Sequence, residues 1–177
     1  MASSANPRIT LDACCFLLLI TGQPGGFESK RILDAVWDGR CDLVESPAIL
    51  VEVLPRHPSD DGSGRRATVR AMLESRFVQY IELSTTVANI ANDLTVRFPK
   101  VRGMDSIHLA TAIFGGCELF VTTNTNEYPM GETVNGVLIL TPADAGERLA
   151  HVLNPARGQV GEDHGQENQP TLPGDAE

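Results

Sequence analysis

Short apolar runs and longer segments with helical spacing alternate along this chain. Apolar runs bounded by turn-forming residues are typical of buried strands, and apolar residues at every third or fourth position are typical of helices that cover a sheet. The expected strands are Arg8–Asp12, Asp42–Val44, Val78–Glu82, Leu119–Thr122 and Val137–Leu140. The expected helices are Cys14–Ile20, Ser29–Trp37, Ala48–Leu54, Arg66–Ser75, Val87–Phe98, Met104–Phe114 and Pro142–Leu153. Because strands and helices alternate, the pattern predicts an α/β fold, a three-layer α/β/α sandwich around a central parallel sheet of about five strands.

Capping and turn residues support these boundaries. Ser46 and Pro47 read as a helix N-cap followed by proline at the first helical position, and Ser84 reads as a second N-cap. A glycine-rich break at Gly22–Gly26 separates the first two helices, and the polar stretch His57–Gly64 indicates a loop.

Composition divides the chain into a domain and a tail. Of 177 residues, 42% are hydrophobic and 21% are charged, as in an ordinary globular domain. Residues 154–177 carry five acidic side chains and one basic one, and they contain too few apolar residues to offset the entropy of ordering. We therefore expect one domain over residues 1–153 and a disordered acidic tail over residues 154–177.

The charge balance limits how the protein meets nucleic acid. The formal net charge is −9, and the tail accounts for −4 of it, which leaves −5 for the domain. An acidic domain does not hold nucleic acid by a broad basic face. Any contact with a nucleic-acid backbone must be local.

Neither a membrane segment nor a disulfide framework is expected. No run reaches the roughly 18 apolar residues of a membrane span, and Cys14–Ile20 lacks the flanks of a signal peptide. Of the other cysteines, Cys15 adjoins Cys14, and Cys41 and Cys117 have no zinc-type spacing. We expect a cytoplasmic protein with reduced thiols in its core.

Three acidic residues stand beside the most apolar segments. Asp12 ends the first strand, Glu52 lies in the helix after the second strand, and Asp105 opens the helix before the fourth strand. An unpaired carboxylate in such a place costs several kcal/mol, so something positive is expected to gather these groups. Ligands of parallel sheets bind where the strand order reverses, and hard oxygen donors there suit a divalent cation such as Mg²⁺. The sequence therefore predicts a metal site at one edge of the sheet.

Four segments carry a resemblance to a known family. They are Leu11-Asp12, Ser46-Pro-Ala-Ile-Leu-Val-Glu52, Met104-Asp-Ser-Ile-His-Leu-Ala-Thr-Ala112 and Leu119-Phe-Val-Thr-Thr-Asn-Thr-Asn126. In this order they resemble the PIN domain family of metal-dependent ribonucleases, and within it the VapC-like toxins of bacterial type II toxin–antitoxin pairs. The resemblance covers roughly Arg8 to Leu153.

The resemblance implies a function and partners. Asp12, Glu52 and Asp105 would be the catalytic residues and would bind Mg²⁺ or Mn²⁺, directly or through water. The protein would hydrolyse phosphodiester bonds of RNA, form a homodimer, and be inhibited by a small antitoxin protein. Whether RNA or DNA is preferred stays open.

The chain departs from the family pattern at two places. The turn after the fourth strand has Asn124 and Asn126 where the family usually supplies one or two aspartates, so a second metal should bind less well. Ala13-Cys14 replaces a Thr-Asn pair near the first acid, which predicts poorer support there. These departures motivate an alternative function, a catalytically degenerate PIN-like module that binds RNA or a protein partner without cutting.

Other polar residues have both functional and structural interpretations. Thr122, Asn124 and Asn126 are candidates for holding the metal or its water, as is Thr123, although such side chains also satisfy turns. Glu45 is an alternative inward-facing acid to Glu52.

The histidine and the basic residues have two interpretations as well. His108, on an otherwise apolar helix, is expected to be a hydrogen-bonded core residue rather than a general base. Arg97, Lys100 and Arg102 precede Asp105 and are candidates for contacting RNA phosphates. A solvated loop is the alternative for these three.

Overall fold

The computed structural model describes residues 6–54 and 64–153. The strands are β1 (Arg8–Leu11), β2 (Asp42–Glu45), β3 (Val78–Tyr80), β4 (Leu119–Val121), β5 (Thr133–Val134) and β6 (Val137–Leu140). The helices are α1 (Ala13–Thr21), α2 (Gly26–Trp37), α3 (Ala48–Val53), α4 (Gly64–Leu73), α5 (Thr85–Arg97), α6 (Met104–Phe114), α7 (Pro142–Arg148) and α8 (Ala150–Leu153). The predicted tail at 154–177 and most of the predicted loop His57–Gly64 lie outside the described residues.

The strands form one sheet in the order β3-β2-β1-β4-β6-β5. All neighbouring strands are parallel except β5 and β6, which are antiparallel. The chain leaves β1 toward β2 on one side and returns to β4 on the other, so the order reverses between β1 and β4. This reversal is where an open parallel sheet leaves room for a ligand.

Strand β5 is a correction to the predicted sheet. The sequence analysis expected about five parallel strands, and the structure adds a short antiparallel strand at the edge. Asn135 and Gly136 connect β5 to β6 with φ values of 48° and 92°, the left-handed conformations that a tight hairpin turn requires. The predicted final helix Pro142–Leu153 is also divided, because the chain turns at the buried residue Leu149 between α7 and α8.

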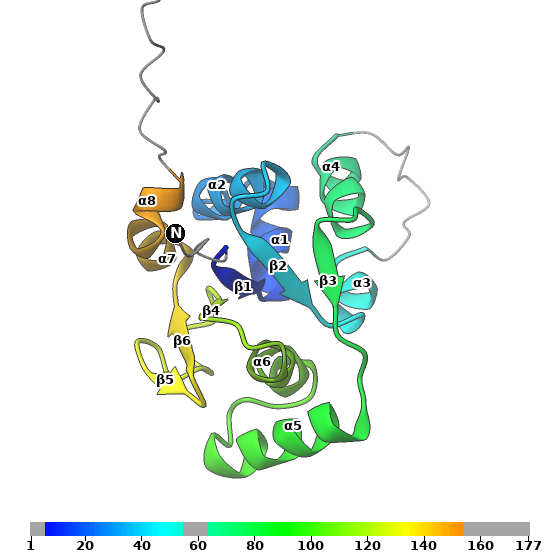
Figure 1. Ribbon diagram of the computed structural model, residues 1–177, viewed down its shortest axis with the longest axis vertical. Helices are drawn as coiled ribbons and strands as arrows, with labels where there is room; N and C mark the ends of the chain where they lie inside the picture. Colours follow the sequence, from blue (N-terminus) through cyan, green and yellow to red (C-terminus); the bar gives the residue numbers. More distant parts are fainter. Residues whose placement is uncertain (1–5, 55–63, 154–177) are drawn as a thin grey trace, which may run out of the picture.

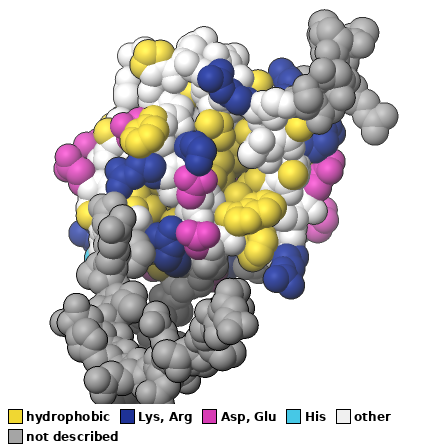
Figure 2. Space-filling model, turned by 90° about the horizontal axis from the view of Figure 1, so that it is seen from above, with side chains coloured by type: hydrophobic (Ala, Val, Ile, Leu, Met, Phe, Trp, Pro, Cys, Tyr) yellow, Lys and Arg dark blue, Asp and Glu magenta, His cyan; other side chains and the backbone are white. Residues whose placement is uncertain are grey.

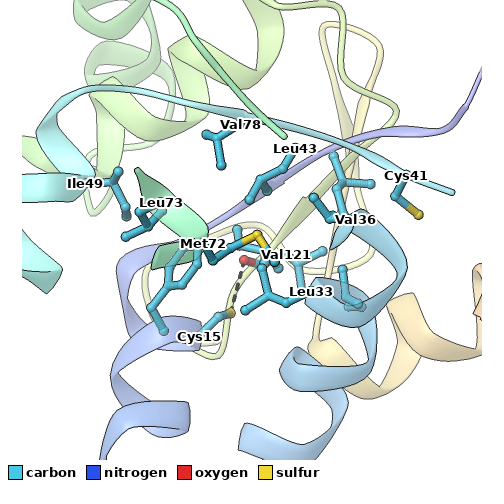
Figure 3. Close-up of a cluster of buried hydrophobic side chains, with 14 of the residues drawn as sticks. Cys15, Leu33, Val36, Cys41, Leu43, Ile49, Met72, Leu73, Val78 and Val121 are labelled. Carbon is cyan, nitrogen blue, oxygen red and sulfur yellow. Dashed lines mark hydrogen bonds between the residues drawn. The ribbon is translucent and has the colours of Figure 1, made fainter. Parts of the chain in front are cut away.

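Helices cover both faces of the sheet, as predicted (Figure 1). One face packs against α1, α2, α3, α4 and α7, and the other packs against α5 and α6. On the first face, buried side chains from strands and helices meet in a single cluster, in which the Cys15 thiol donates to the carbonyl oxygen of Val121 at 3.4 Å (Figure 3). All four cysteines are free thiols, as expected.

No helix in residues 6–54 or 64–153 is long and apolar enough to cross a membrane.

Candidate active site at the sheet switch point

Asp12 lies at the point where the strand order reverses. It follows β1 directly and is the N-cap of α1, where its Oδ1 accepts the backbone N–H of Ala13 at 2.9 Å. Its Oδ2 accepts the hydroxyl of Thr122 at 2.7 Å, which joins the end of β1 to the end of β4. The side chain is only 3% exposed. The cap of α1 and the hydrogen bond from Thr122 thus hold the Asp12 carboxylate at the end of β1, where the sequence predicts it.

Cys14 makes polar contacts with Asp12 and Thr122 that the sequence analysis did not expect. Its thiol donates to Asp12 Oδ2 at 3.2 Å and lies 3.4 Å from the hydroxyl oxygen of Thr122. Its sulfur also accepts the backbone N–H of Thr123 at 3.2 Å. The poorer support expected at Ala13-Cys14 stays a prediction, because the thiol contacts both sides of the switch point and also raises the pKa of the Asp12 carboxyl group.

The surroundings of Asp12 disfavour its charge. Burial raises the pKa of this carboxyl group to about 8, and only the Thr122 hydroxyl among the main contributors acts clearly in the other direction. The negative charge of Asp105 contributes to the same upward shift. Such a carboxylate is stabilised if a cation joins the site.

Asp105 occupies the first turn of α6, where a carboxylate also favours the positive end of the helix. The helix begins after Gly103, whose φ of 55° suits glycine. The Tyr128 hydroxyl donates to the backbone carbonyl of Asp105 at 3.2 Å, and Tyr128 is almost fully buried. The start of α6 is thereby tied to the turn that follows β4.

Glu127 is a site residue that the sequence analysis missed. Burial, and then the neighbouring Glu127 carboxyl group, raise the pKa of Asp105 to about 6. The amide of Asn124 donates to Glu127 Oε2. The signal available in the sequence was a carboxylate three residues after Asn124.

Glu52 reaches the site from α3, but its carboxylate is paired with a histidine. Its Oε2 lies 2.5 Å from Nε2 of His108, whose side chain is fully buried, while that of Glu52 is 30% exposed. The prediction that His108 is a hydrogen-bonded core residue is confirmed. The negative charge of Glu52 also contributes to the raised pKa of Asp105.

Glu45, the alternative inward acid, lies at the end of β2. It is fully buried, and its Oε1 accepts the backbone N–H of Leu11 at 3.0 Å. Its Oε2 has no hydrogen-bond partner in the described part of the chain. Burial raises its pKa well above the ordinary value, which favours a neutral carboxylic acid in the core.

The predicted phosphate-binding residues divide into two groups. Lys100 and Arg102 line a groove that also contains Asn126 and Glu127. The Lys100 ammonium donates to the backbone carbonyl of Asn126 at 3.2 Å, and Arg102 donates to that of Pro99.

Arg97 is placed differently. Its guanidinium lies over the ring of Phe98, 4.8 Å from the ring centre. Of the three predicted phosphate-binding residues, Lys100 and Arg102 therefore line the groove beside Glu127, and Arg97 does not.

A comparison with protein families gives a match that covers most of the domain. The family model described as PIN domain matches residues 9–129, a range that contains β4 and every acid described above. The chain belongs to the PIN domain family.

The comparison with solved structures gives matches to chains of two complexes. A toxin-antitoxin complex from Klebsiella pneumoniae has 24% sequence identity over 76% of this chain and 97% of the other, with a TM-score of 0.53. VapBC2 from Rickettsia felis, bound to a DNA fragment from its promoter, has 14% identity over 76% of this chain and 98% of the other, with a TM-score of 0.48. No curated protein matches the sequence.

The PIN domain has donors that suit a divalent cation, although they are not assembled into a tight group. Within residues 6–54 and 64–153 there is no cluster of three or more His, Cys, Asp or Glu side chains with metal-binding geometry. Asp12 is nevertheless a buried carboxylate with no ion pair to a basic residue among the described residues, and the neighbouring Glu127 carboxyl group raises the pKa of Asp105. Mg²⁺ is usually held by one or two carboxylates and several waters, so these residues fit a hydrated ion.

Proposed function

We propose that this PIN domain is a metal-dependent endoribonuclease. The observation that carries the proposal is the pair Asp12 and Asp105, whose pKa values are raised to about 8 and about 6 at the switch point of the sheet. Strongly shifted acids in such a location are typical of functional sites. The reaction is the hydrolysis of phosphodiester bonds in RNA.

Each acid has a separate role in this proposal. Asp12 and Asp105 bind Mg²⁺ or Mn²⁺, and Glu52, which His108 holds at 2.5 Å, acts on the same ion through water. Thr122 orients Asp12 through the 2.7 Å hydrogen bond and also accepts the backbone N–H of Asn124 at 3.0 Å. When bound, a divalent ion of this kind activates water and stabilises charge on phosphate oxygens.

The groove beside Glu127 supports a role in binding the RNA backbone. Lys100 and Arg102 line it, and two cations are enough for a local contact with phosphates on an otherwise acidic protein. Arg97 is proposed to contribute less, because its guanidinium is stacked on Phe98. Asn126 takes part through its backbone carbonyl, which accepts a hydrogen bond from Lys100.

We further propose that the protein is the toxin of a toxin–antitoxin pair, acts as a homodimer in the cytoplasm and is inhibited by a small antitoxin. Four free thiols suit a reducing compartment. An apolar pocket of about 510 Å³ between α1, α2 and α4 gives a partner protein a surface to bind, and hydrophobic side chains reach the surface between charged ones on the face drawn in Figure 2. Trp37, which lines this pocket, is 49% exposed.

A second candidate function is binding without cutting. Asn124 and Asn126 favour it, because amides stand where the resemblance expects carboxylates and add no negative charge. In this case the domain would bind RNA or a protein partner with little affinity for Mg²⁺.

Cleavage of labelled RNA separates the two functions. Purified protein is incubated with single-stranded and hairpin RNA in Mg²⁺ or Mn²⁺, beside an Asp105→Asn variant and an EDTA control. Cutting that requires the metal and is lost in the variant supports the nuclease. If the folded protein cuts no RNA in a broad panel, the result supports the second function, binding without cutting.

A further inference from the structure

The Glu52 carboxylate has a single polar partner, a histidine in the core. Its Oε2 lies 2.5 Å from Nε2 of His108, and no other residue in the ranges 6–54 and 64–153 forms a hydrogen bond or an ion pair with it. A carboxylate only accepts hydrogen bonds, so Nε2 of the imidazole is the donor. The orientation of the Glu52 side chain therefore depends on His108.

Helix α3, which carries Glu52, does not fix this orientation by itself. The helix has six residues, and its buried side chains are Ile49 and Val53. The side chain of Glu52 is 30% exposed. A glutamate at the edge of solvent keeps several rotamers unless a partner restricts them. The hydrogen bond from His108 provides that restriction.

A histidine at position 108 is not what core packing alone favours. The side chain is fully buried, and its Nδ1 has no hydrogen-bond partner in the part of the chain that the structure describes. An unpartnered polar atom in the core destabilises the folded state, and a leucine of similar volume would avoid this cost. Residues that break packing rules in this way occur mainly at functional sites.

Helix α6 brings two acids of the site together. Asp105 lies in its first turn, and His108 follows three residues later, so the two side chains are neighbours on the helix surface. With a rise of 1.5 Å per residue, their positions are about 4.5 Å apart along the helix axis. Asp105 belongs to α6, and Glu52 reaches the same helix from α3 through the imidazole. One helix thus positions both carboxylates.

We infer that His108 is a positioning residue of the site, which holds the Glu52 carboxylate within one helical turn of Asp105 so that both acids face the same hydrated divalent ion. The inference rests on the proposed function in assuming a divalent cation at Asp105. It gives the imidazole an effect on metal binding that is exerted only through Glu52. Hydrogen-bond partners of metal-binding groups typically change metal affinity or activity by about 10- to 100-fold.

Calorimetric titration of the full chain with Mn²⁺ alone tests the inference. His108→Leu fills the core and removes the donor, and we expect it to weaken Mn²⁺ binding about tenfold. His108→Gln places an amide N–H near the position of Nε2 and should restore most of the lost affinity.

Thr111→Val is the matched control for this titration. Thr111 is fully buried one turn further along α6, and its hydroxyl also lacks a partner among the described residues. The substitution keeps the shape of the side chain and removes one buried polar atom without touching Glu52. Its Mn²⁺ affinity should equal that of the wild type.

A second titration asks whether His108 acts through Glu52. In a Glu52→Ala background, His108→Leu should cause no further loss of Mn²⁺ affinity, because the group that it positions is already gone. Equal losses in the wild-type and Glu52→Ala backgrounds would show a general structural role and overturn the inference.

Thermal unfolding of the metal-free variants separates positioning from folding. His108→Leu should unfold within a few degrees of the wild type or above it, because leucine fills a similar volume without an unpartnered nitrogen. A much lower midpoint, together with weak Mn²⁺ binding that His108→Gln does not restore, would overturn the inference. If His108→Leu does not fold, His108→Asn replaces it in both titrations, because its shorter amide ends near the position of Nδ1.

The remaining outcomes separate this inference from the nuclease proposal. Equal Mn²⁺ affinity of His108→Leu and wild type refutes the inference and leaves the nuclease standing. A wild-type protein that binds no Mn²⁺ overturns both. Mn²⁺ binding that depends on His108 through Glu52, in a protein that cuts no RNA, supports the inference and refutes the nuclease.

Discussion

Two acids at helix α6, Glu52 beside it and Asp105 in its first turn, lie in opposite electrostatic settings. Glu52 meets the imidazole of His108, which can donate to it, whereas Asp105 meets Glu127, a second acid. The first contact is satisfied within the protein, and the second is not. The difference indicates that the demand for a cation lies on the Asp105 side of the site, although the sequence presents both Glu52 and Asp105 as candidate metal ligands.

Substituting the two acids should therefore have unequal effects on RNA cleavage. We expect Asp105→Asn to lower the single-turnover rate at least about 1,000-fold, since a metal-stabilised transition state is worth several kcal/mol. Glu52→Gln should lower it about tenfold, because its amide can still meet His108. Equal losses in the two variants would show that the contrast between the acids has no functional meaning.

Removing the imidazole should destabilise the fold. His108→Ala leaves a cavity in the core and takes away the partner of Glu52, so we expect the free energy of unfolding to fall by about 2–4 kcal/mol. Urea denaturation measures it. His151→Ala, on an exposed position of α8, is the control and should stay within about 0.5 kcal/mol of the wild type.

The stability of the metal-free protein should depend on pH through the unsatisfied acids. The pKa of Asp12 is raised from 3.8 to about 8 and that of Asp105 from 3.8 to about 6. At these two groups the folded state binds more protons than the unfolded state between pH 3.8 and about 8, so the stability that they contribute is greatest at low pH and is lost as the pH rises toward 8. The Cys14 thiol, which contacts Asp12 and whose pKa is lowered to about 4, acts in the opposite direction.

Thermal scans check this dependence. In a Cys14→Ser variant, which removes the opposing thiol, the unfolding temperature of the metal-free protein should fall by about 5 °C or more from mildly acidic to mildly alkaline pH, since 1 kcal/mol shifts it by about 2–4 °C in a domain of this size. Asp12→Asn should flatten the profile. An unfolding temperature that rises with pH in this range would refute the assignment.

The smallest expected effect concerns the basic residues beside Asp105. Lys100→Ala should raise KM for RNA about three- to tenfold and reduce its salt dependence, because one phosphate contact is lost. Arg97→Ala, whose guanidinium is stacked on Phe98, should change KM less than about twofold. A larger effect at Arg97 would place the RNA on another surface.

The sequence predicts the fold well where local signals and tertiary packing agree. Met104–Phe114 is found with both ends correct, and Ser84 caps its helix through the N–H of Val87, as expected. The hairpin of β5 was missed although Asn135-Gly136 signals such a turn, because a strand of two residues has no hydrophobic period to detect.

The candidate site is harder to predict, because its pairings depend on contacts between distant elements. Asp12 is recognisable from its place at the end of an apolar strand. The Glu52–His108 contact depends on how α3 packs against α6, and the Asp105–Glu127 contact depends on how Tyr128 attaches the turn to α6. No pattern along the chain specifies either contact.

The most direct test of the central claim is RNA cleavage by the wild-type protein after EDTA treatment, with and without Mn²⁺ added back. The account predicts no cutting in EDTA, recovery with Mn²⁺, and no recovery in Asp105→Asn. Cutting that persists in EDTA, or a folded wild-type protein that stays inactive in Mn²⁺, would contradict it.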